Sequence, residues 1–273
     1  MTDHDLCYSH VALRTKAVQV KNIEKVVQAM SGQRRALGED LPDLALAALD
    51  EGIDKLKPIR RKLLGELETI VAGSPLGEWI SETHGLGKGL ILLLGICPPL
   101  TEFDTVSAVW KYAGLHVSDG SAVRGQRGQR LGFDPVRRAY AIKRVADPIM
   151  KVGGPYREVY DDRRAHTLGT HPPMLDEDGE LAHPGCEHCA EAMAKTKRHR
   201  EGREYTRRRS APSFDCSNLG GVHWTDGHRH ADALRVTAKA VLRDAYRVVR
   251  GQPPRVGPNS RDDHDDTAHA EAA

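Results

Sequence analysis

The feature that most restricts the fold of this chain is the helical spacing of its apolar residues. Residues 11–30 and 46–70 each carry apolar side chains three, four or seven positions apart, as one face of a helix requires. The segment 38–42 separates the two series, and we expect Pro58 to kink or split the second helix. No segment alternates apolar and polar residues as a half-buried strand does. The sequence therefore predicts a mainly α protein whose residues 1–75 form a helical hairpin or coiled-coil arm, with an ordinary helical-bundle segment as the less specific alternative.

Composition limits the class of protein further. Only 5% of the residues are aromatic, so the core must consist of aliphatic side chains. The five cysteines form an odd set with one close pair, which argues against a secreted disulfide framework. Residues 1–10 lack the pattern of a signal peptide, and the longest apolar run, 90–97, is too short to span a membrane. We expect a cytoplasmic, nucleoid-associated protein that does not contact membranes.

Changes in amino-acid composition divide the rest of the chain into segments. Residues 76–166 contain helical segments separated by glycines, and residues 167–227 are poor in apolar side chains and rich in Pro, Gly, His and charge. We expect the latter to be an irregular, basic insertion. Residues 228–250 return to a helix with one apolar face, and residues 251–273 have the composition of a disordered tail.

A strongly basic stretch lies in the middle of a chain whose formal net charge is only +2. Between Ser121 and Lys151, acidic residues occur only at Asp134 and Asp147. The basic residues there are Arg124, Arg127, Arg130, Arg137, Arg138, Lys143, Arg144 and Lys151. Fixed positive charge of this density favours a nucleic-acid backbone as the partner, and arginine adds bidentate contacts to phosphate. The less specific interpretation is a solvated basic face without a partner.

The order of several short motifs resembles a known family. They are His84-Gly85-Leu86-Gly87, Phe103, Lys111-Tyr112-Ala113-Gly114-Leu115, Gly132, Val136-Arg137-Arg138-Ala139 and Tyr156 to Tyr160. In this order and spacing they resemble the C-terminal transposase domain of the IS-one-ten/IS-one-sixteen (IS-nine-oh-two) insertion-sequence family. The resemblance covers about residues 56–167 and returns at 228–249. It implies a compact helical domain with a helix–hairpin–helix-like turn.

The resemblance also implies site residues. In the family a loop serine attacks DNA and forms a covalent phosphoserine link, and the family's spacing before Gly132 points to Ser121, with Ser118 as the nearby alternative. This chain departs from the family by reading Gly120-Ser121-Ala122 where a Ser-Gly pair is usual.

The glycine turn has a physical interpretation of its own. Gly85 and Gly87 would let backbone N–H groups approach a phosphate, and Lys88 would add a charge. The competing interpretation is a plain tight turn between two core helices.

Full-length members of the family begin with a nuclease-like domain that carries four acidic metal ligands. We expect that domain to be absent here, because the helical arm starts too early, and we interpret the acidic residues near the N-terminus as surface charge; these are Asp3, Asp5, Glu24, Asp50 and Asp54. Mg²⁺ would then be a cofactor only if a separate acidic domain supplied its ligands. Two functions follow: a DNA transposase or recombinase acting through Ser121, or a non-catalytic nucleic-acid-binding remnant or partner subunit. DNA is the expected partner, a structured guide RNA is a further candidate, and the arm would mediate homo-oligomerisation.

A second group of residues has the chemistry of a metal site. Cys186 and Cys189 form a Cys-x2-Cys pair, and Cys216 and His223 follow downstream. Structural zinc takes four nitrogen or sulfur ligands, so three cysteines and one histidine would complete a site. His223 is the fourth ligand we select, while other histidines nearby leave that choice open. The alternative is a His-rich insertion with unengaged thiols.

Overall fold

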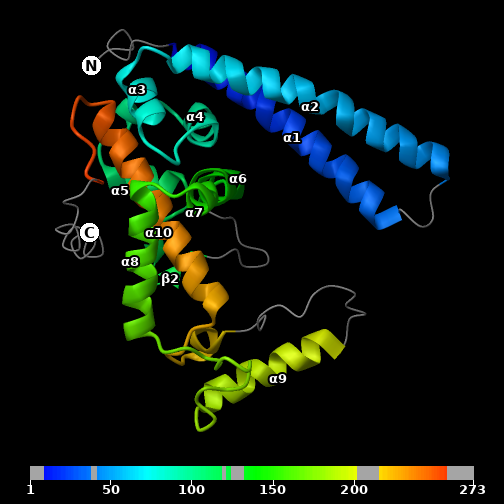
Figure 1. Cartoon of the computed structure of the whole chain (residues 1–273), viewed down its shortest axis with the longest axis vertical. Helices are drawn as coiled ribbons and strands as arrows, with labels where there is room; N and C mark the ends of the chain where they lie inside the picture. Colours follow the sequence, from blue (N-terminus) through cyan, green and yellow to red (C-terminus); the bar gives the residue numbers. More distant parts are fainter. Residues whose placement is uncertain (1–8, 38–41, 119–120, 124–131, 202–214, 257–273) are drawn as a thin grey trace. The chain divides into compact units, whose positions relative to one another are not determined.

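The computed structural model describes residues 9–37, 42–118, 121–123, 132–201 and 215–256. The mainly α fold is confirmed, because helices account for almost all of the regular structure in these ranges (Figure 1). The chain forms two compact units: unit 1 contains residues 1–156 and 238–273, and unit 2 contains residues 157–237. Unit 2 therefore includes the expected insertion and extends beyond it at both ends. Among the described residues, no helix combines the length and apolar character needed to cross a membrane.

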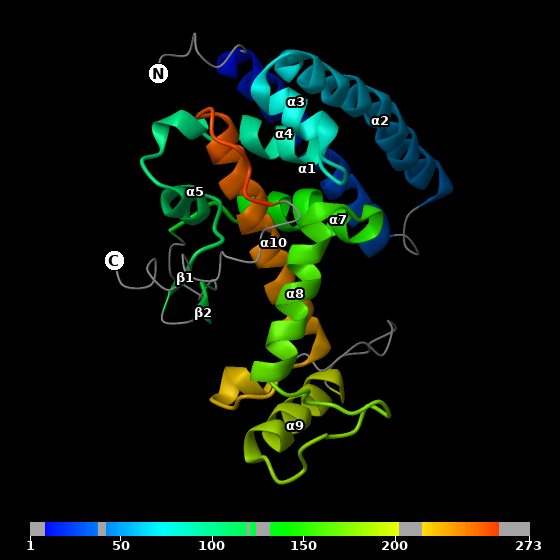
Figure 2. The same cartoon turned by 60° about the vertical axis from the view of Figure 1, so that its left-hand side comes forward.

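The first two helices of unit 1 pack side by side along their length (Figures 1 and 2). They are α1 (His10–Leu37) and α2 (Asp43–Val71). Ion pairs between Arg34 and Asp50, at 2.5 Å, and between Lys16 and Glu66, at 2.7 Å, join them. The expected split at Pro58 is wrong, because α2 continues through this residue as one helix. Packing against α1 and α4 favours the continuous helix over the local cost of the proline.

The core of unit 1 lies around α4 (Lys88–Gly95), in which every residue from Leu90 to Gly95 is buried. A helix that is apolar on all sides belongs inside a protein, and α4 packs against α1, α2 and a π-helical segment, η3 (Ala141–Ala146). Gly89 makes the last contact possible, since a Cβ there would lie 1.9 Å from the carbonyl oxygen of Arg144. The remaining elements of unit 1 are α3 (Pro75–Glu82), η2 (Leu100–Glu102), α5 (Val106–Tyr112), α6 (Pro135–Tyr140) and α7 (Asp147–Val152).

Unit 1 also contains a short antiparallel pair of strands that the sequence did not predict. They are β1 (Val117–Ser118) and β2 (Ser121–Ala122). Val117 pairs with Ala122, and Ser118 pairs with Ser121. Two-residue strands are too short to produce an alternating pattern, so they could not be predicted from the sequence.

Unit 2 contains the whole of α9 (Glu187–Glu201) and the short η4 (Cys216–Leu219). It also contains parts of α8 (Pro155–Thr170) and α10 (Asp226–Val248). Within residues 167–227, which we expected to be irregular, α9 is a regular helix of 15 residues. Unit 2 contains a small buried cluster of Met174, Cys189, Ala192 and Cys216, with Leu175, Leu181, Cys186, Met193 and Leu219 packed against it. Two of the four buried residues of this cluster are cysteines.

Candidate metal centre and nucleic-acid interface

The structure brings together the four side chains that the sequence selected as metal ligands. Cys186 precedes α9, Cys189 lies in its first turn, Cys216 begins η4, and His223 lies in the segment before α10. Their three sulfur atoms and one imidazole nitrogen all lie within 4.8 Å of one another. Among the described residues, this is the one group of His, Cys, Asp and Glu side chains with such an arrangement.

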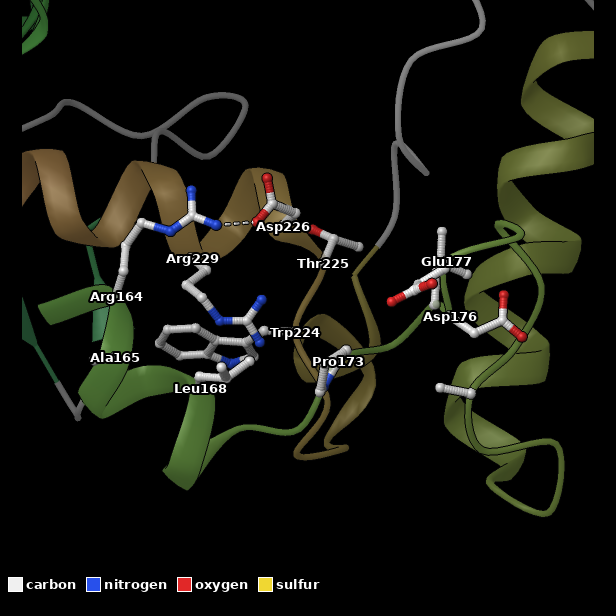
Figure 3. A pocket seen from close by; sticks show the side chains of 12 residues that line it. Arg164, Ala165, Leu168, Pro173, Asp176, Glu177, Trp224, Thr225, Asp226 and Arg229 are labelled. Atoms are coloured by element: carbon white, nitrogen blue, oxygen red, sulfur yellow. Dashed lines mark hydrogen bonds and ion pairs between the residues drawn. The ribbon is translucent and has the colours of Figure 1, made fainter. Parts of the chain in front are cut away.

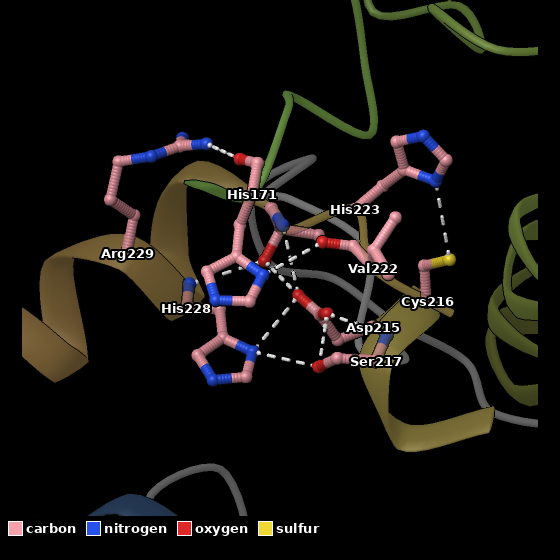
Figure 4. A network of polar contacts seen from close by, with 9 residues as sticks. His171, Asp215, Cys216, Ser217, Val222, His223, His228 and Arg229 are labelled. Carbon is pink, nitrogen blue, oxygen red and sulfur yellow. Dashed lines mark hydrogen bonds and ion pairs between the residues drawn. The ribbon is translucent and has the colours of Figure 1, made fainter. Parts of the chain in front are cut away.

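The distances between these atoms fit a tetrahedral metal site. The sulfur atoms of Cys186 and Cys216 are 3.9 Å apart, and Nδ1 of His223 lies 3.4 Å from the sulfur of Cys189. The same nitrogen lies 3.7 Å from the sulfur of Cys216 (Figure 4). Zinc–sulfur bonds of about 2.3 Å and zinc–nitrogen bonds of about 2.0 Å imply edges of roughly 3.8 Å and 3.5 Å in a tetrahedron. The Cys₃His cluster could therefore hold a metal such as zinc.

The three thiols lie in unequal environments. Burial raises the pKa values of Cys189 and Cys216, because it disfavours the thiolate. The pKa of Cys186 is instead lowered, first by the backbone N–H of Cys189 and then by further hydrogen bonds from its neighbours. A coordinated cation would outweigh the effect of burial, because a thiol that binds zinc is deprotonated.

Close packing around Cys216 depends on a glycine that the sequence analysis did not select. A Cβ at Gly221 would lie 2.1 Å from the Cys216 sulfur, so no larger residue fits without movement. The preceding residue, Gly220, adopts φ 90° and ends η4, where the N–H of Gly221 bonds to the carbonyl of Cys216 at 3.1 Å. The Gly-Gly pair four residues after Cys216 was the available signal for this turn.

A buried carboxylate, Asp215, fixes the segment that carries Cys216 and was also missed. One carboxylate oxygen accepts hydrogen bonds from the N–H and hydroxyl of Ser217, and the other accepts them from the N–H and hydroxyl of Thr225 (Figure 4). His228 lies 3.3 Å from the second oxygen. Burial alone would raise the pKa of Asp215, but these hydrogen bonds outweigh it and hold the pKa well below the usual carboxyl value. Asp215 thereby links the start of η4 to the start of α10.

Stacked rings hold the residues that flank His223. The indole of Trp224 lies between two imidazoles, with ring centres 3.9 Å from His171 and 4.2 Å from His228 and nearly parallel planes. His183 stacks on His223 itself, with ring centres 4.1 Å apart. The ring of the fourth ligand is therefore held in place independently of any metal.

In unit 1 the glycine turn selected from the sequence is closely packed. Gly85 has φ 91°, and a Cβ there would lie 2.7 Å from the carbonyl oxygen of Gly153. Gly87 accepts the first hydrogen bonds of α4 through its carbonyl, and Lys88 pairs with Glu68 at 2.8 Å. Packing alone thus requires Gly85, and the contact of Lys88 is with a carboxylate.

The described basic residues of the central stretch are mostly engaged within unit 1. Arg137 lies over the ring of Tyr112 at 4.0 Å, and Nη1 of Arg138 donates to the carbonyl of Val123 at 2.5 Å. Arg144 pairs with Glu24 at 2.8 Å, and Lys143 is exposed. Arg124, Arg127 and Arg130 lie outside the described residues.

Cationic side chains lie near His116, the residue that immediately precedes the β1–β2 pair. The pKa of His116 is lowered, mainly by burial and further by the nearby cations of Lys111, Arg138 and Lys239. His116 immediately precedes β1, in which Ser118 is the backbone partner of Ser121. The pairing thus places the two serines opposite each other, close in the chain to a cationic region.

The acidic residues of the arm have basic partners. Glu24 binds Arg60 at 2.6 Å and Arg144 at 2.8 Å, and it also accepts a hydrogen bond from the hydroxyl of Tyr140. Asp50 pairs with Arg34, and Asp54 with Lys57. Asp3 and Asp5 lie outside the described residues. The side chain of Glu24 is largely buried rather than on the surface, so it is a structural link between α1, α2 and the helix after α6.

No protein-family model, curated protein or solved structure matches this chain. The geometry described above therefore carries the functional argument.

Proposed function

We propose that this chain binds DNA as a transposase- or recombinase-like protein of an insertion sequence, with Ser121 as the nucleophile. The observation that carries the proposal is the cationic region of Lys111, Arg138 and Lys239 around His116, at the base of the β1–β2 pair. A phosphate next to these cations would be attracted electrostatically, and the charge of a transferring phosphoryl group would be stabilised there.

In the proposed reaction the Ser121 hydroxyl attacks a backbone phosphorus of DNA. A phosphoserine ester forms as the bond to one deoxyribose oxygen breaks, the serine proton passes to a base, and the leaving oxygen takes up a proton. The lowered pKa of His116 keeps its imidazole neutral at neutral pH, so it has the protonation state that a base needs.

Salt dependence tests the binding part of the proposal. We expect the affinity for DNA to fall steeply as the salt concentration rises. In a plot of the logarithm of the binding constant against the logarithm of the salt concentration, the slope should be about −0.9 for each phosphate neutralised. A Lys111→Ala/Lys239→Ala variant should reduce that slope, whereas Lys55→Ala on α2 should leave it unchanged. Affinity that does not depend on salt, or no affinity for any nucleic acid at low salt, would contradict the proposal.

Trapping of a covalent protein–DNA adduct on nicked or branched DNA tests the chemistry. The adduct should disappear in Ser121→Ala and persist in Ser118→Ala. The reverse result would assign the nucleophile to Ser118. If no adduct forms even after an acidic nuclease-like domain with Mg²⁺ is added, the protein binds nucleic acid without acting on it.

That second candidate function, a non-catalytic binding protein or partner subunit, has an observation in its favour. The described acidic residues of the arm already neutralise basic side chains, with Glu24 bound to two arginines and Asp50 bound to a third. Carboxylates engaged in this way would have to give up their partners before they could hold Mg²⁺. Homo-oligomerisation through the arm, a structured RNA partner and nucleoid association remain predictions.

We also infer that the Cys₃His cluster holds one structural zinc ion. All four ligands come from the protein, which is typical of a structural zinc site rather than a catalytic one with an open position. The small core of unit 2 supports this role, because short, weakly apolar units commonly depend on a metal for stability.

A further inference from the structure

Unit 2 contains a hollow that the metal site does not use (Figure 3). It lies between the end of α8, the segment around Pro173 and the first turn of α10. The residues that matter for its chemistry are Arg164, Leu168, Trp224, Asp226 and Arg229.

Arg229 is the unusual member of this group, because it is a buried cation without a bound carboxylate. Its side chain is only 4% exposed, and one hydrogen bond, from Nη2 to the carbonyl of His171 at 2.9 Å, holds it. Its Nε atom is buried and has no hydrogen-bond partner among the described residues. Burial lowers the pKa of the guanidinium, since the charge has left water. Buried charges are ordinarily paired through direct hydrogen bonds, and Arg229 keeps donor capacity that no carboxylate of the described residues uses.

Other groups around the hollow favour an anion near Arg229. Arg164 supplies a second guanidinium, which pairs with Asp226 and donates to the hydroxyl of Tyr160 at 3.1 Å. The indole N–H of Trp224 has no hydrogen-bond partner in the described part of the chain, so it is a further donor for a ligand. Trp224 is held in place by its two stacked imidazoles and would not need to be ordered on binding.

The acidic residues of the hollow are accounted for. Asp226 is bound to Arg164, and Asp176 accepts the backbone N–H groups of Asp178 and Glu180. Figure 3 shows Asp176 and Glu177 on the side of the hollow opposite Arg229. Asp226 and Asp215 lie near enough to act on the charge of Arg229, but no carboxylate of the described residues is bound to it.

We propose that this hollow binds one phosphate group, with Arg229 as its counter-ion and Trp224 and Arg164 as further donors. Arginine and phosphate form strong charge-assisted hydrogen bonds, and the start of α10 adds the favourable end of a helix dipole. The phosphate could come from free inorganic phosphate or from a nucleic-acid backbone, and only the second source rests on the function proposed above. That source would make unit 2 a second contact to DNA, separate from the β1–β2 region.

Calorimetric titration of the zinc-loaded full-length chain with inorganic phosphate, against chloride at equal ionic strength, tests the site. We expect Arg229→Gln to weaken phosphate binding by about tenfold or more, because it removes a charge-assisted bond. The matched control is Arg157→Gln, an arginine of α8 outside the hollow, which should bind phosphate as the unaltered protein does. No phosphate binding by the unaltered protein, or equal binding by a folded Arg229→Gln variant, overturns the proposal.

Arg229 is buried, so a second variant covers the case in which Arg229→Gln does not fold. Trp224→Phe keeps an aromatic ring between the two histidines and removes the indole N–H. It should weaken phosphate binding severalfold while zinc content stays the same, and unchanged affinity overturns the proposal.

Titration with a DNA oligonucleotide separates the two sources. If Arg229→Gln weakens both phosphate and DNA binding, the site is a backbone contact. If only phosphate binding falls, the site takes free phosphate. If the protein binds phosphate but no nucleic acid, the phosphate site stands and the proposed function fails. If DNA binds but phosphate does not, the proposed function stands and this inference fails.

Discussion

The two units of this protein differ in the side chains that they bury. Unit 1 buries an unbroken aliphatic run from Leu90 to Leu94 against α1, α2 and η3. Unit 2 buries Met174, Cys189, Ala192 and Cys216, and two of these four are thiols placed to coordinate a metal. The hydrophobic effect suffices where apolar residues are dense, and we propose that a bound metal takes its place in unit 2, where they are sparse.

The contrast extends to single helices. Helix α4 is buried on every side, whereas α9 is strongly polar and carries Cys189 in its first turn. A polar helix gains little from burial, so its position must be fixed by specific contacts. In unit 2 those contacts join α9 to η4 and to the segment before α10, through Cys189 and its neighbours Cys216 and His223.

The largest effect is expected from removal of a buried ligand in unit 2. Cys189→Ser should abolish zinc binding and unfold unit 2, because structural zinc contributes on the order of 10 kcal/mol to such units. Hydrogen exchange should then show loss of protection in α9 and retention in α4. Cys97→Ser, at a buried cysteine of unit 1, is the control and should keep the zinc. Retained protection of α9 in Cys189→Ser would show that the unit stands without metal.

The second prediction concerns a substitution in the aliphatic core of unit 1. Leu92→Ala removes a side chain that is 1% exposed and should lower the free energy of unfolding of unit 1 by about 2–5 kcal/mol. Chemical denaturation measures this loss. Zinc content should stay at the level of the unaltered protein, and a loss of zinc would show that the metal site depends on the core of unit 1.

A smaller effect is expected from crowding of the metal site without removal of a ligand. Gly221→Ala places a methyl group against the Cys216 sulfur and should cost about 1–3 kcal/mol, seen as weaker zinc retention in a competition with a chelator. Gly227→Ala is the matched control, since a Cβ there meets nothing within 4 Å. Equal zinc retention by the two variants would contradict the close approach of Gly221 to the Cys216 sulfur.

The smallest effect concerns the carboxylate beside the site. The pKa of Asp215 is lowered in the folded state, so its ionised form stabilises unit 2 above the ordinary carboxyl pKa of about 4. That contribution disappears as the pH falls through the lowered value. Asp215→Asn should therefore cost roughly 1–2 kcal/mol at neutral pH, and the difference between the two proteins should shrink in acid. Melting curves of both proteins at each pH measure it, and a constant difference would contradict the assignment.

Features set by local sequence could be predicted, and features set by tertiary contacts could not. Helical periodicity located α1 and α10, and the Cys-x2-Cys pair with Cys216 and His223 located the cluster. Low apolar content misled the prediction for α9, although its Ala, Glu, Met and Lys residues are strong helix formers.

The second group includes the role of Asp215, whose partner Thr225 is ten residues away along the chain. It also includes the continuity of α2 through Pro58, which packing decides against local preference. The close approach of Gly221 to Cys216 had a visible signal in the Gly-Gly pair, but only the fold shows which atom lies against it.

Metal analysis of the full-length chain, purified without a histidine tag under reducing conditions, tests whether unit 2 is built around a metal ion. We predict one zinc ion per chain, lost in a Cys186→Ser/Cys189→Ser variant, together with rapid proteolysis within unit 2 once the metal is removed by a chelator. A zinc content near zero, or a unit 2 that resists protease equally with and without chelator, would contradict the claim that this unit is built around a metal.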